Sequence, residues 1–173
     1  MARTLIAYFS RADENYFGGA MRYVKVGNTE IVCNLMQELI DADSFKIEMK
    51  EPYSPVYMTC IDEAKRDLRS NARPELVSYP ESTDEYDTVI VAFPNWWTTM
   101  PMAVFTFLEN YDFSGKTICP LITHGGSGFS NSLKDIKRLC PTANITEGLA
   151  INGDNAATCD KDVEKWLKKI GLK

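Results

Sequence analysis

The feature that most constrains this chain is a repeated alternation of short apolar runs with segments of helical periodicity. Residues 5–9 form an apolar run too short for a helix, and residues 88–93 are apolar on both faces, as expected of strands buried in a parallel sheet. The segments that follow such runs place apolar residues every three or four positions, as on one face of a helix. We expect five β-α units, because this repetition gives a parallel sheet with right-handed crossovers and helices on both faces.

The remaining elements follow from the same patterns. The chain of 173 residues fits one domain, 1–173, and shows no composition shift that indicates a second. A capping signal over 59–62 predicts the start of the second helix, and Pro101 suits the first turn of the third. The other expected strands are 45–49, 117–123 and one within 145–151; the expected helices are 29–41, 59–71, 101–111, 133–139 and 163–170.

Charge and cysteine content exclude several classes of function. The net charge of -5 argues against general nucleic-acid binding, which needs a basic face. The five cysteines are scattered, without a C-x-x-C pair, and predict neither a disulfide framework nor a zinc site. We expect most of them to be buried in a protein of a reducing compartment. No signal peptide or membrane-spanning run is visible, so we expect a soluble, cytoplasmic protein without a membrane partner.

One segment, at about 11–26, does not fit the β-α repeat. It is too long for an ordinary strand-to-helix turn, and Gly18-Gly19 at its middle indicates an excursion that leaves the first strand and returns to the first helix. Loops of this length are either functional or disordered. Three basic residues and three aromatic residues within it favour an ordered, functional insertion.

Three loops fall where ligands bind in open parallel sheets, beyond the carboxyl ends of the strands. The first combines Ser10 with residues 27–29 at a helix start, where backbone N–H groups and the helix dipole attract an anion. Alternatively, Asn28 or Thr29 only caps the helix. The second, residues 94–101, holds adjacent tryptophans between two prolines, which suits stacking on a flat ring or packing at the core edge.

The third loop, 123–128, is rich in glycine. Glycines let the main chain approach a ligand closely, although a flexible turn before a helix would use them too. Each loop has a structural explanation by itself. Their occurrence together, in one predicted cleft, favours a ligand site.

These loops carry a resemblance to the flavodoxin family, in particular to its short bacterial flavodoxin-like branch. The similar stretches are YFSR with GNT, then FPNWWTTMP, then THGGSG, with ARPEL, FTFLENYDFSGK and DIKRLCP between them. The resemblance implies a flavodoxin-like α/β fold, with a five-stranded parallel sheet of order 2-1-3-4-5 and a non-covalently bound FMN. It also implies electron transfer between a reductase and an acceptor protein, by a monomer or weak dimer.

Carried onto this chain, the resemblance places the FMN phosphate on the first loop, one side of the isoalloxazine on the second and its pyrimidine end on the third. It implies no catalytic or metal-binding residue. The implied FMN-binding residues are Ser10, Arg11, Gly27, Asn28, Thr29, Pro94, Asn95, Trp96, Trp97, Thr98, Thr123, His124, Gly125, Gly126, Ser127 and Gly128.

Two features depart from the family pattern, Thr98 and the divided phosphate loop, and another residue, His124, has two alternative roles. Many relatives have glycine where this chain has Thr98, and a β-branched residue resists a positive φ at a cost of about 1–3 kcal/mol. His124, the single histidine, is either protonated beside the flavin or neutral and hydrogen-bonded within its loop. The insertion also divides the usually compact phosphate loop, so that this site must be reassembled in space.

The sequence also leaves other functions open. An FMN-dependent NAD(P)H oxidoreductase acting on quinones or similar small acceptors would use the same flavin site. A flavin-free interaction domain would keep the fold without the cofactor. A serine hydrolase is a poor fit: residues 125–129 nearly match a nucleophile elbow, but Phe129 replaces the last glycine and no second histidine can act as base.

Overall fold

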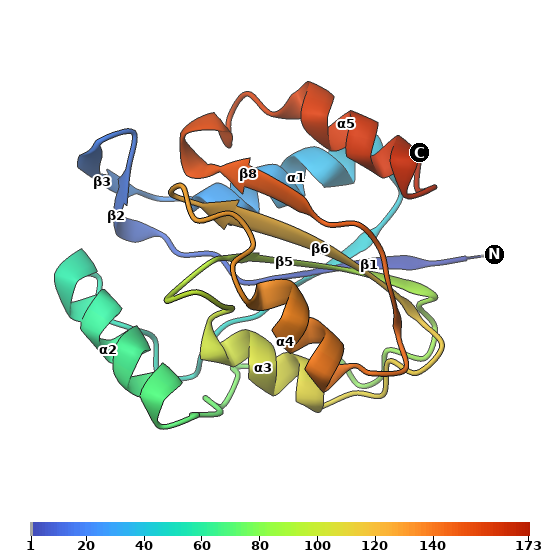
Figure 1. Cartoon of the computed structure of the whole chain (residues 1–173), viewed down its shortest axis with the longest axis horizontal. Coiled ribbons are helices and arrows are strands. Elements are labelled where there is room, and N and C mark those ends of the chain that lie inside the picture. The colour runs from blue at the N-terminus through green and yellow to red at the C-terminus, as the bar shows by residue number, and fades with distance from the viewer. Residues whose placement is uncertain (1) are drawn as a thin grey trace.

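A central parallel sheet runs through the protein, whose computed structural model describes residues 2–173 (Figure 1). Its order is β4-β1-β5-β6, with β7 and β8 both beside β6, and every pair is parallel. The expected flavodoxin-like order is therefore confirmed, with the fifth strand divided in two. The strands are β1 (Thr4–Tyr8), β4 (Asp43–Lys46), β5 (Thr88–Pro94), β6 (Thr117–His124), β7 (Asn144–Ile145) and β8 (Leu149–Asn152).

The division of the last strand has a local cause. β7 pairs with Thr117 and Ile118, whereas β8 pairs with β6 from Leu121 onward. Pro120 lies between these two stretches and has no N–H to donate to a ladder. A side chain at Gly148 would come within 3.1 Å of the Pro120 carbonyl oxygen and 2.8 Å of the Phe129 ring, so the chain presses against β6 at the break.

Helices cover both faces of the sheet, as the β-α repeat predicts. In Figure 1, α1 (Asn28–Leu39) and α5 (Asp160–Lys169) lie above the sheet, and α3 (Met102–Glu109) and α4 (Ser132–Leu139) lie below it. Alternate residues of each strand face the two layers: Leu5 and Ala7 pack on the α3/α4 side, and Ile6 and Tyr8 on the α1/α5 side. No helix in residues 2–173 is both long and apolar enough to cross a membrane.

The five cysteines are all buried and free, in agreement with the expectation that they serve as small apolar residues. Burial raises the pKa of the Cys60 thiol to about 11 and that of Cys140 to about 11. Both thiols are therefore protonated at neutral pH and unreactive.

The insertion is a two-stranded antiparallel hairpin, β2 (Asp13–Phe17) and β3 (Ala20–Val24). Gly18 and Gly19 form its turn with φ values of 62° and 75°, the pair of positive angles that a type I′ turn requires. The segment expected to leave the first strand and return to the first helix is thus a hairpin in the structure. Figure 1 shows the hairpin at the end of the sheet where β8 ends, above α2.

Helix α2 (Tyr57–Arg69) begins two residues before the expected Thr59, and the capping signal predicted over 59–62 is wrong. Val56 is the N-cap residue and makes no side-chain capping bond. Instead, the Tyr57 amide donates to Oε1 of Glu14, at 3.0 Å. The cap therefore comes from the hairpin, and local sequence cannot reveal a cap supplied from 43 positions away. Pro101 is likewise the N-cap of α3 and precedes its first turn.

Candidate functional site

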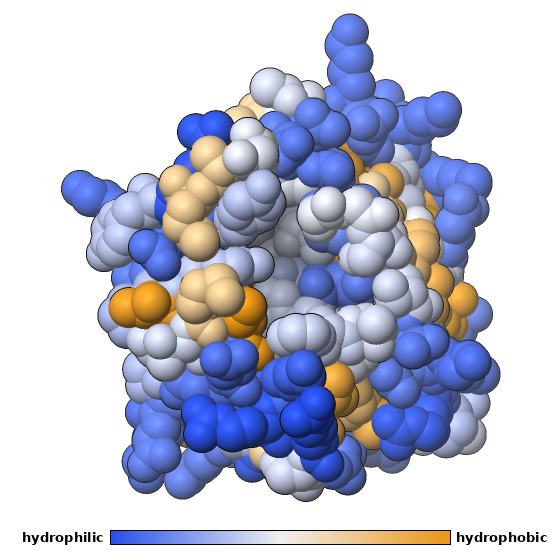
Figure 2. Space-filling view, turned by 60° about the vertical axis from the view of Figure 1, so that its left-hand side comes forward, coloured by the Kyte–Doolittle hydropathy of each residue, from blue (hydrophilic) through white to orange (hydrophobic). Residues whose placement is uncertain are grey.

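A cleft lies at the carboxyl ends of β1, β5 and β6. It consists of two adjoining cavities, of about 140 Å³ and 260 Å³, which we call together the central cleft. Figure 2 brings this end of the sheet toward the viewer and shows the surface hollowed near the middle, with hydrophobic residues at one margin. The residues that line both cavities are Arg11, Asn15, Tyr57, Asn95 and Trp96.

The first loop is assembled across the hairpin. A side chain at Gly27 would overlap the Arg11 carbonyl oxygen and the Ser10 hydroxyl, so glycine is required for this close approach. Ser10 Oγ accepts the Glu30 amide at 3.1 Å, in the first turn of α1. The two halves of the loop thus meet in space, although the hairpin separates them in sequence.

The start of α1 provides a site for an anion. Asn28 and Thr29 line the smaller cavity, and amides in the first turn of a helix have no partner within it. These donors and the helix dipole both favour negative charge. The Thr29 side chain has another role, because its Oγ1 lies 2.7 Å from Oγ1 of Thr123, and both residues are buried. That hydrogen bond fastens α1 to β6 beneath the cleft.

Arg11 lines the cleft but is largely engaged by main chain. Its Nη2 donates to the carbonyl oxygens of Glu14, at 3.2 Å, and Pro55, at 3.1 Å. Its Nε is buried without a partner among residues 2–173. Arg11 therefore holds the hairpin against the segment before α2 and keeps one donor free at the cleft wall.

The second loop makes a tight turn of unusual composition. Trp96 and Thr99 exchange hydrogen bonds of 2.7 and 3.1 Å, and the residues between them have φ values of 49° (Trp97) and 75° (Thr98). This is a type I′ turn, which Asn-Gly normally fills. Thr98 adopts the positive φ that its side chain resists, and the Asn131 amide donates to its carbonyl oxygen at 2.8 Å.

The two tryptophans lie differently. Trp96 is half-buried and packs edge-to-face on Phe9, with ring centroids 5.3 Å apart. Trp97 is 40% exposed, donates from Nε1 to the Ile61 carbonyl oxygen at 2.9 Å and lies beneath the Lys65 ammonium. Trp97 therefore closes the cleft on the α2 side, and Trp96 forms its floor beside Asn95.

The side chain of Asn95 has a buried oxygen at the cleft that accepts no hydrogen bond from the described residues. Its Nδ2 donates to Ser127 Oγ at 2.8 Å and to Ser130 Oγ at 3.3 Å, which fixes the orientation of the amide. Its Oδ1 is buried and has no partner in the described chain. An unpaired buried acceptor costs about 1–3 kcal/mol, so this oxygen calls for a donor from a ligand.

The third loop contributes through His124 and Gly125, which line the smaller cavity with Thr123 and Pro94. The Gly126 amide donates to His124 Nδ1 at 2.9 Å, and burial lowers the pKa of the imidazole. Both observations favour the neutral, loop-bonded histidine over the protonated one. Among the other expected residues, Ser127 acts through Asn95, and Thr98, Gly126 and Gly128 shape the loops without lining either cavity.

The sequence does not predict five residues of the smaller cavity, nor Cys60, Ile61 and Ala64, which line the larger one. Of the five, Tyr57 begins α2, and Gly153 belongs to the short helix η1 (Gly153–Asn155) that follows β8. Gly153 lies against α1, since a side chain there would come within 2.7 Å of Asn28 Nδ2. The other three, on β2, are Asn15, Tyr16 and Phe17. The Gly-Gly pair between two short runs was a usable hairpin signal.

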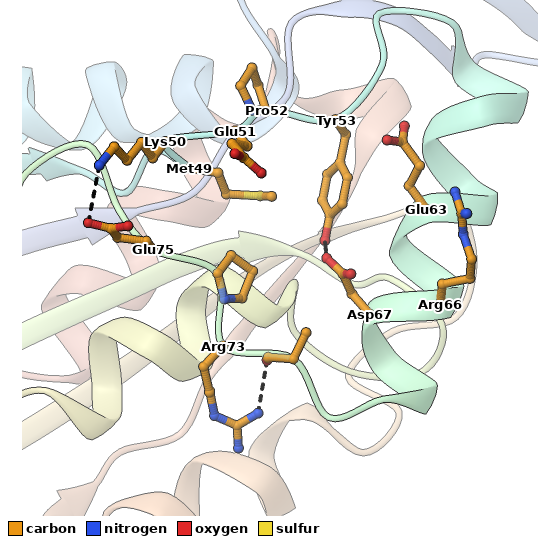
Figure 3. A pocket seen from close by; sticks show the side chains of 12 residues that line it. Met49, Lys50, Glu51, Pro52, Tyr53, Glu63, Arg66, Asp67, Arg73 and Glu75 are labelled. Carbon is orange, nitrogen blue, oxygen red and sulfur yellow. Dashed lines mark hydrogen bonds and ion pairs between the residues drawn. The ribbon is translucent and has the colours of Figure 1, made fainter.

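A larger cavity of about 650 Å³ lies between the segment before α2 and the segment after it (Figure 3). Its charged groups mostly bond to protein: Tyr53 Oη donates to Asp67 at 2.5 Å, and Lys50 lies 3.4 Å from Glu75. Burial and the Asp67 carboxylate raise the pKa of Tyr53. Tyr53 also packs on Trp96, with ring centroids 5.9 Å apart. A side chain in the wall of this cavity therefore supports the floor of the central cleft from behind.

Comparison with known proteins finds a family profile and solved structures that match this chain. The flavodoxin family profile matches residues 20–170. A Bacteroides uniformis protein described as a flavoprotein is 31% identical, with a TM-score of 0.74 over 96% of this chain and 98% of that one. One from Bacteroides eggerthii is 26% identical, with a TM-score of 0.80 over the full length of both chains (100% each).

A more distant structure, a flavoprotein of Lactobacillus acidophilus in complex with FMN, shares the fold at 17% identity. Its TM-score is 0.64, over 96% of this chain and 99% of that one. Comparison with curated proteins finds no match.

Proposed function

The chain belongs to the flavodoxin family, whose cofactor is FMN, and we propose that it holds one FMN in the central cleft and carries electrons between partner proteins. The observation that carries this proposal is the buried, unpaired Oδ1 of Asn95 in the cleft wall. A flavin ring has an N–H donor at its polar edge, which would complete the hydrogen bonds of that oxygen.

The remaining residues of the cleft fit the other parts of FMN. The amides at the start of α1 and the Ser10 hydroxyl would hold the phosphate, since an anion is stabilised by helix N-terminal donors. Trp96 offers an aromatic surface for the ring, and the loop of His124 and Gly125 borders its far side. When bound, FMN would supply a group that takes up and releases electrons; the protein would orient it and exclude water.

The electron-carrier role is supported by the surface around the cleft. The indole of Trp97 is exposed at the margin, as are Val56 and Met58 near the start of α2 and Tyr16 and Met21 on the hairpin. An apolar rim around a redox centre suits transient contact with a partner protein. Docking there would bring an acceptor close to the ring without opening the cleft.

The test of FMN binding starts with the visible spectrum of the purified protein and identification of any released flavin. Protein freed of flavin is then titrated with FMN. We expect Asn95→Leu to weaken FMN binding about tenfold, the loss of one buried hydrogen bond. Asn110→Leu, at the exposed end of α3, is the matched control and should bind as the parent does. A colourless protein that takes up no FMN would refute the proposal.

A second candidate, an FMN-dependent NAD(P)H oxidoreductase acting on small acceptors such as quinones, is favoured by a separate cavity. A space of about 440 Å³ shares Arg11 and Trp96 with the cleft and has Phe9, Tyr53 and Met49 in its walls. Its size and aromatic lining suit a small planar acceptor. Steady-state oxidation of NADH or NADPH with a quinone, in the absence of any reductase, would establish this activity; its absence leaves the carrier role.

A further inference from the structure

The β2–β3 hairpin is fastened at both of its ends to elements on opposite sides of the central cleft. Its base is bonded to the segment that opens α2, and its tip to η1, beside the start of α1. Hairpins with free tips are common on protein surfaces, so two separate attachments indicate a defined position.

The attachment at the base involves three hydrogen bonds. The Glu14 carboxylate accepts the Tyr57 amide at 3.0 Å, and the Glu14 amide donates to the Pro55 carbonyl oxygen at 3.3 Å. Arg11 donates to the same Pro55 oxygen at 3.1 Å. A carboxylate at a helix N-terminus is stabilised by the helix dipole, which strengthens this attachment.

The attachment at the tip is smaller and more specific. The Gly18 amide, free at the corner of the type I′ turn, donates to Oδ1 of Asp154 at 2.5 Å. The preceding residue, Phe17, packs on η1: its Cβ is 3.7 Å from the position that a side chain on Gly153 would take. The Arg22 guanidinium lies over the Phe17 ring, and its Nε donates to the Phe17 carbonyl oxygen at 3.1 Å.

The tip therefore covers one particular end of the cleft. Phe17 and Gly153 line the same cavity as Asn28 and Thr29, the residues whose amides form the anion site. Ser10 and the Arg11 main chain close the adjacent side, where they press on Gly27. The anionic end of a ligand bound at the start of α1 would therefore be enclosed by the hairpin tip on one side and by Ser10 and the Arg11 main chain on the other.

We propose that the hairpin tip limits this site to a flavin with a single terminal phosphate and excludes flavin dinucleotides. The inference rests on the proposed function, because it assigns the α1 end of the cleft to the FMN phosphate. A second phosphate with its nucleoside would extend from that end into Phe17 and the Gly18–Asp154 hydrogen bond. The dinucleotide could bind only by displacing the tip, whereas FMN would fit beneath it.

A shortened hairpin tests this directly. Deleting Tyr16, Phe17, Ala20 and Met21 joins Asn15 to Arg22 through the native Gly18-Gly19 turn, and these two residues already face each other in the ladder. Removing two residues from each strand preserves the alternation of hydrogen-bonded pairs, so the turn remains compatible. Glu14 and Arg11 stay in place, and only the covering tip is lost.

We expect the full-length protein to bind FMN at least about 100-fold more tightly than FAD, and the shortened variant to bind the two within about tenfold. Flavin fluorescence measures both affinities, and circular dichroism checks the fold of the variant. A shortened variant that keeps the full preference for FMN would overturn the inference. So would a full-length protein that binds both flavins equally. Failure of the full-length protein to bind either flavin would instead refute the proposed function, and the inference with it.

A pair of point variants tests the tip without altering chain length. Asp154→Asn removes the charge but keeps an acceptor oxygen for Gly18, whereas Asp154→Ala removes both. The comparison therefore isolates the hydrogen bond from the repulsion between Asp154 and a phosphate. We expect FMN to dissociate about three- to tenfold faster from the alanine variant than from the asparagine variant. Equal rates would show that the tip does not retain the ligand. Asp41→Ala, on the exposed turn after α1, is the control for loss of an acidic side chain.

Discussion

At the scale of single residues, backbone strain is concentrated in the turn that carries the tryptophans. Trp97 and Thr98 both have positive φ, although neither side chain favours that region. Such residues cost about 1–3 kcal/mol each and persist where the surroundings determine them. Here the Trp97 indole is bonded to Ile61 and the Thr98 carbonyl to Asn131. The strain lies beside the cleft, where it fixes the tryptophan positions before a ligand arrives.

Replacing Thr98 by glycine should stabilise the flavin-free protein. Glycine removes the strain of φ 75° but increases the entropy of the unfolded chain, so we expect a net gain of up to about 1 kcal/mol in the free energy of unfolding. Urea denaturation measures it. Thr59→Gly, at an exposed position in α2, is the matched control and should lose about 0.5 kcal/mol. Loss of stability in Thr98→Gly would show that the turn is not strained.

His124 makes stability depend on pH in a defined direction. Burial lowers the pKa of the folded imidazole below 6.5, so the unfolded state binds its proton first as the pH falls. The contribution of the neutral ring is complete above about pH 6.5 and is lost as the pH falls below that value. The single histidine gives one imidazole signal in an NMR titration, and we expect its pKa below 6.5. His124→Asn, which keeps an acceptor for Gly126, should lack this pH dependence. A folded pKa at or above 6.5 would contradict the neutral assignment.

At the scale of elements, helix α2 depends on the hairpin for its first turn. It has no acidic residue in that turn and no side-chain cap of its own, and Glu14 supplies both functions. The hairpin and α2 therefore form one unit at the side of the sheet. This unit provides Tyr57, Asn15 and Arg11 to the cleft.

Removing the Glu14 carboxylate should loosen the start of α2. We expect Glu14→Ala to speed amide hydrogen exchange in residues 60–62, the first amides bonded within α2, by about fivefold, the effect of losing a cap of about 1 kcal/mol. Glu14→Gln, which keeps an acceptor oxygen, should show a smaller effect. Glu38→Ala, at an exposed position of α1, should leave α2 unchanged. Unaltered exchange in both Glu14 variants would mean that Tyr57 does not need this cap.

The elements that sequence predicts well are those with local patterns. Buried strands such as Thr88–Pro94 and amphipathic helices such as Ser132–Leu139 follow from apolar periodicity, and the strand order follows from the β-α repeat together with the family resemblance. The parts that sequence misses depend on distant contacts: the cap from Glu14, the break opposite Pro120 and the cleft lining from Gly153. The sequence predicts the cleft residues that follow the strands. It predicts the hairpin only as an ordered insertion and does not show that Asn15, Tyr16 and Phe17 line the cleft.

At the scale of the whole molecule, the central cleft exists only when the complete sheet is formed. Its walls come from the loop after β1, the ends of β5 and β6, the hairpin, α2 and η1, which are far apart in the sequence. Thr29 and Thr123 illustrate this, because their hydrogen bond joins residues 94 positions apart. A ligand in the cleft therefore binds the folded state alone, and its binding energy adds to global stability.

This coupling predicts how much each part of FMN contributes to stability. At 100 times its dissociation constant, FMN should raise the free energy of unfolding by about 2.7 kcal/mol and increase the thermal midpoint accordingly. Riboflavin at the same concentration should produce a clearly smaller shift, because it lacks the phosphate that would meet the amides of Asn28 and Thr29 at the start of α1. Inorganic phosphate alone should raise the thermal midpoint less than FMN does, since it would occupy the same end of the cleft without filling the ring site. Equal shifts from FMN and riboflavin would show that the first turn of α1 does not bind the phosphate, and would move the assignment of that end of the cleft to another group.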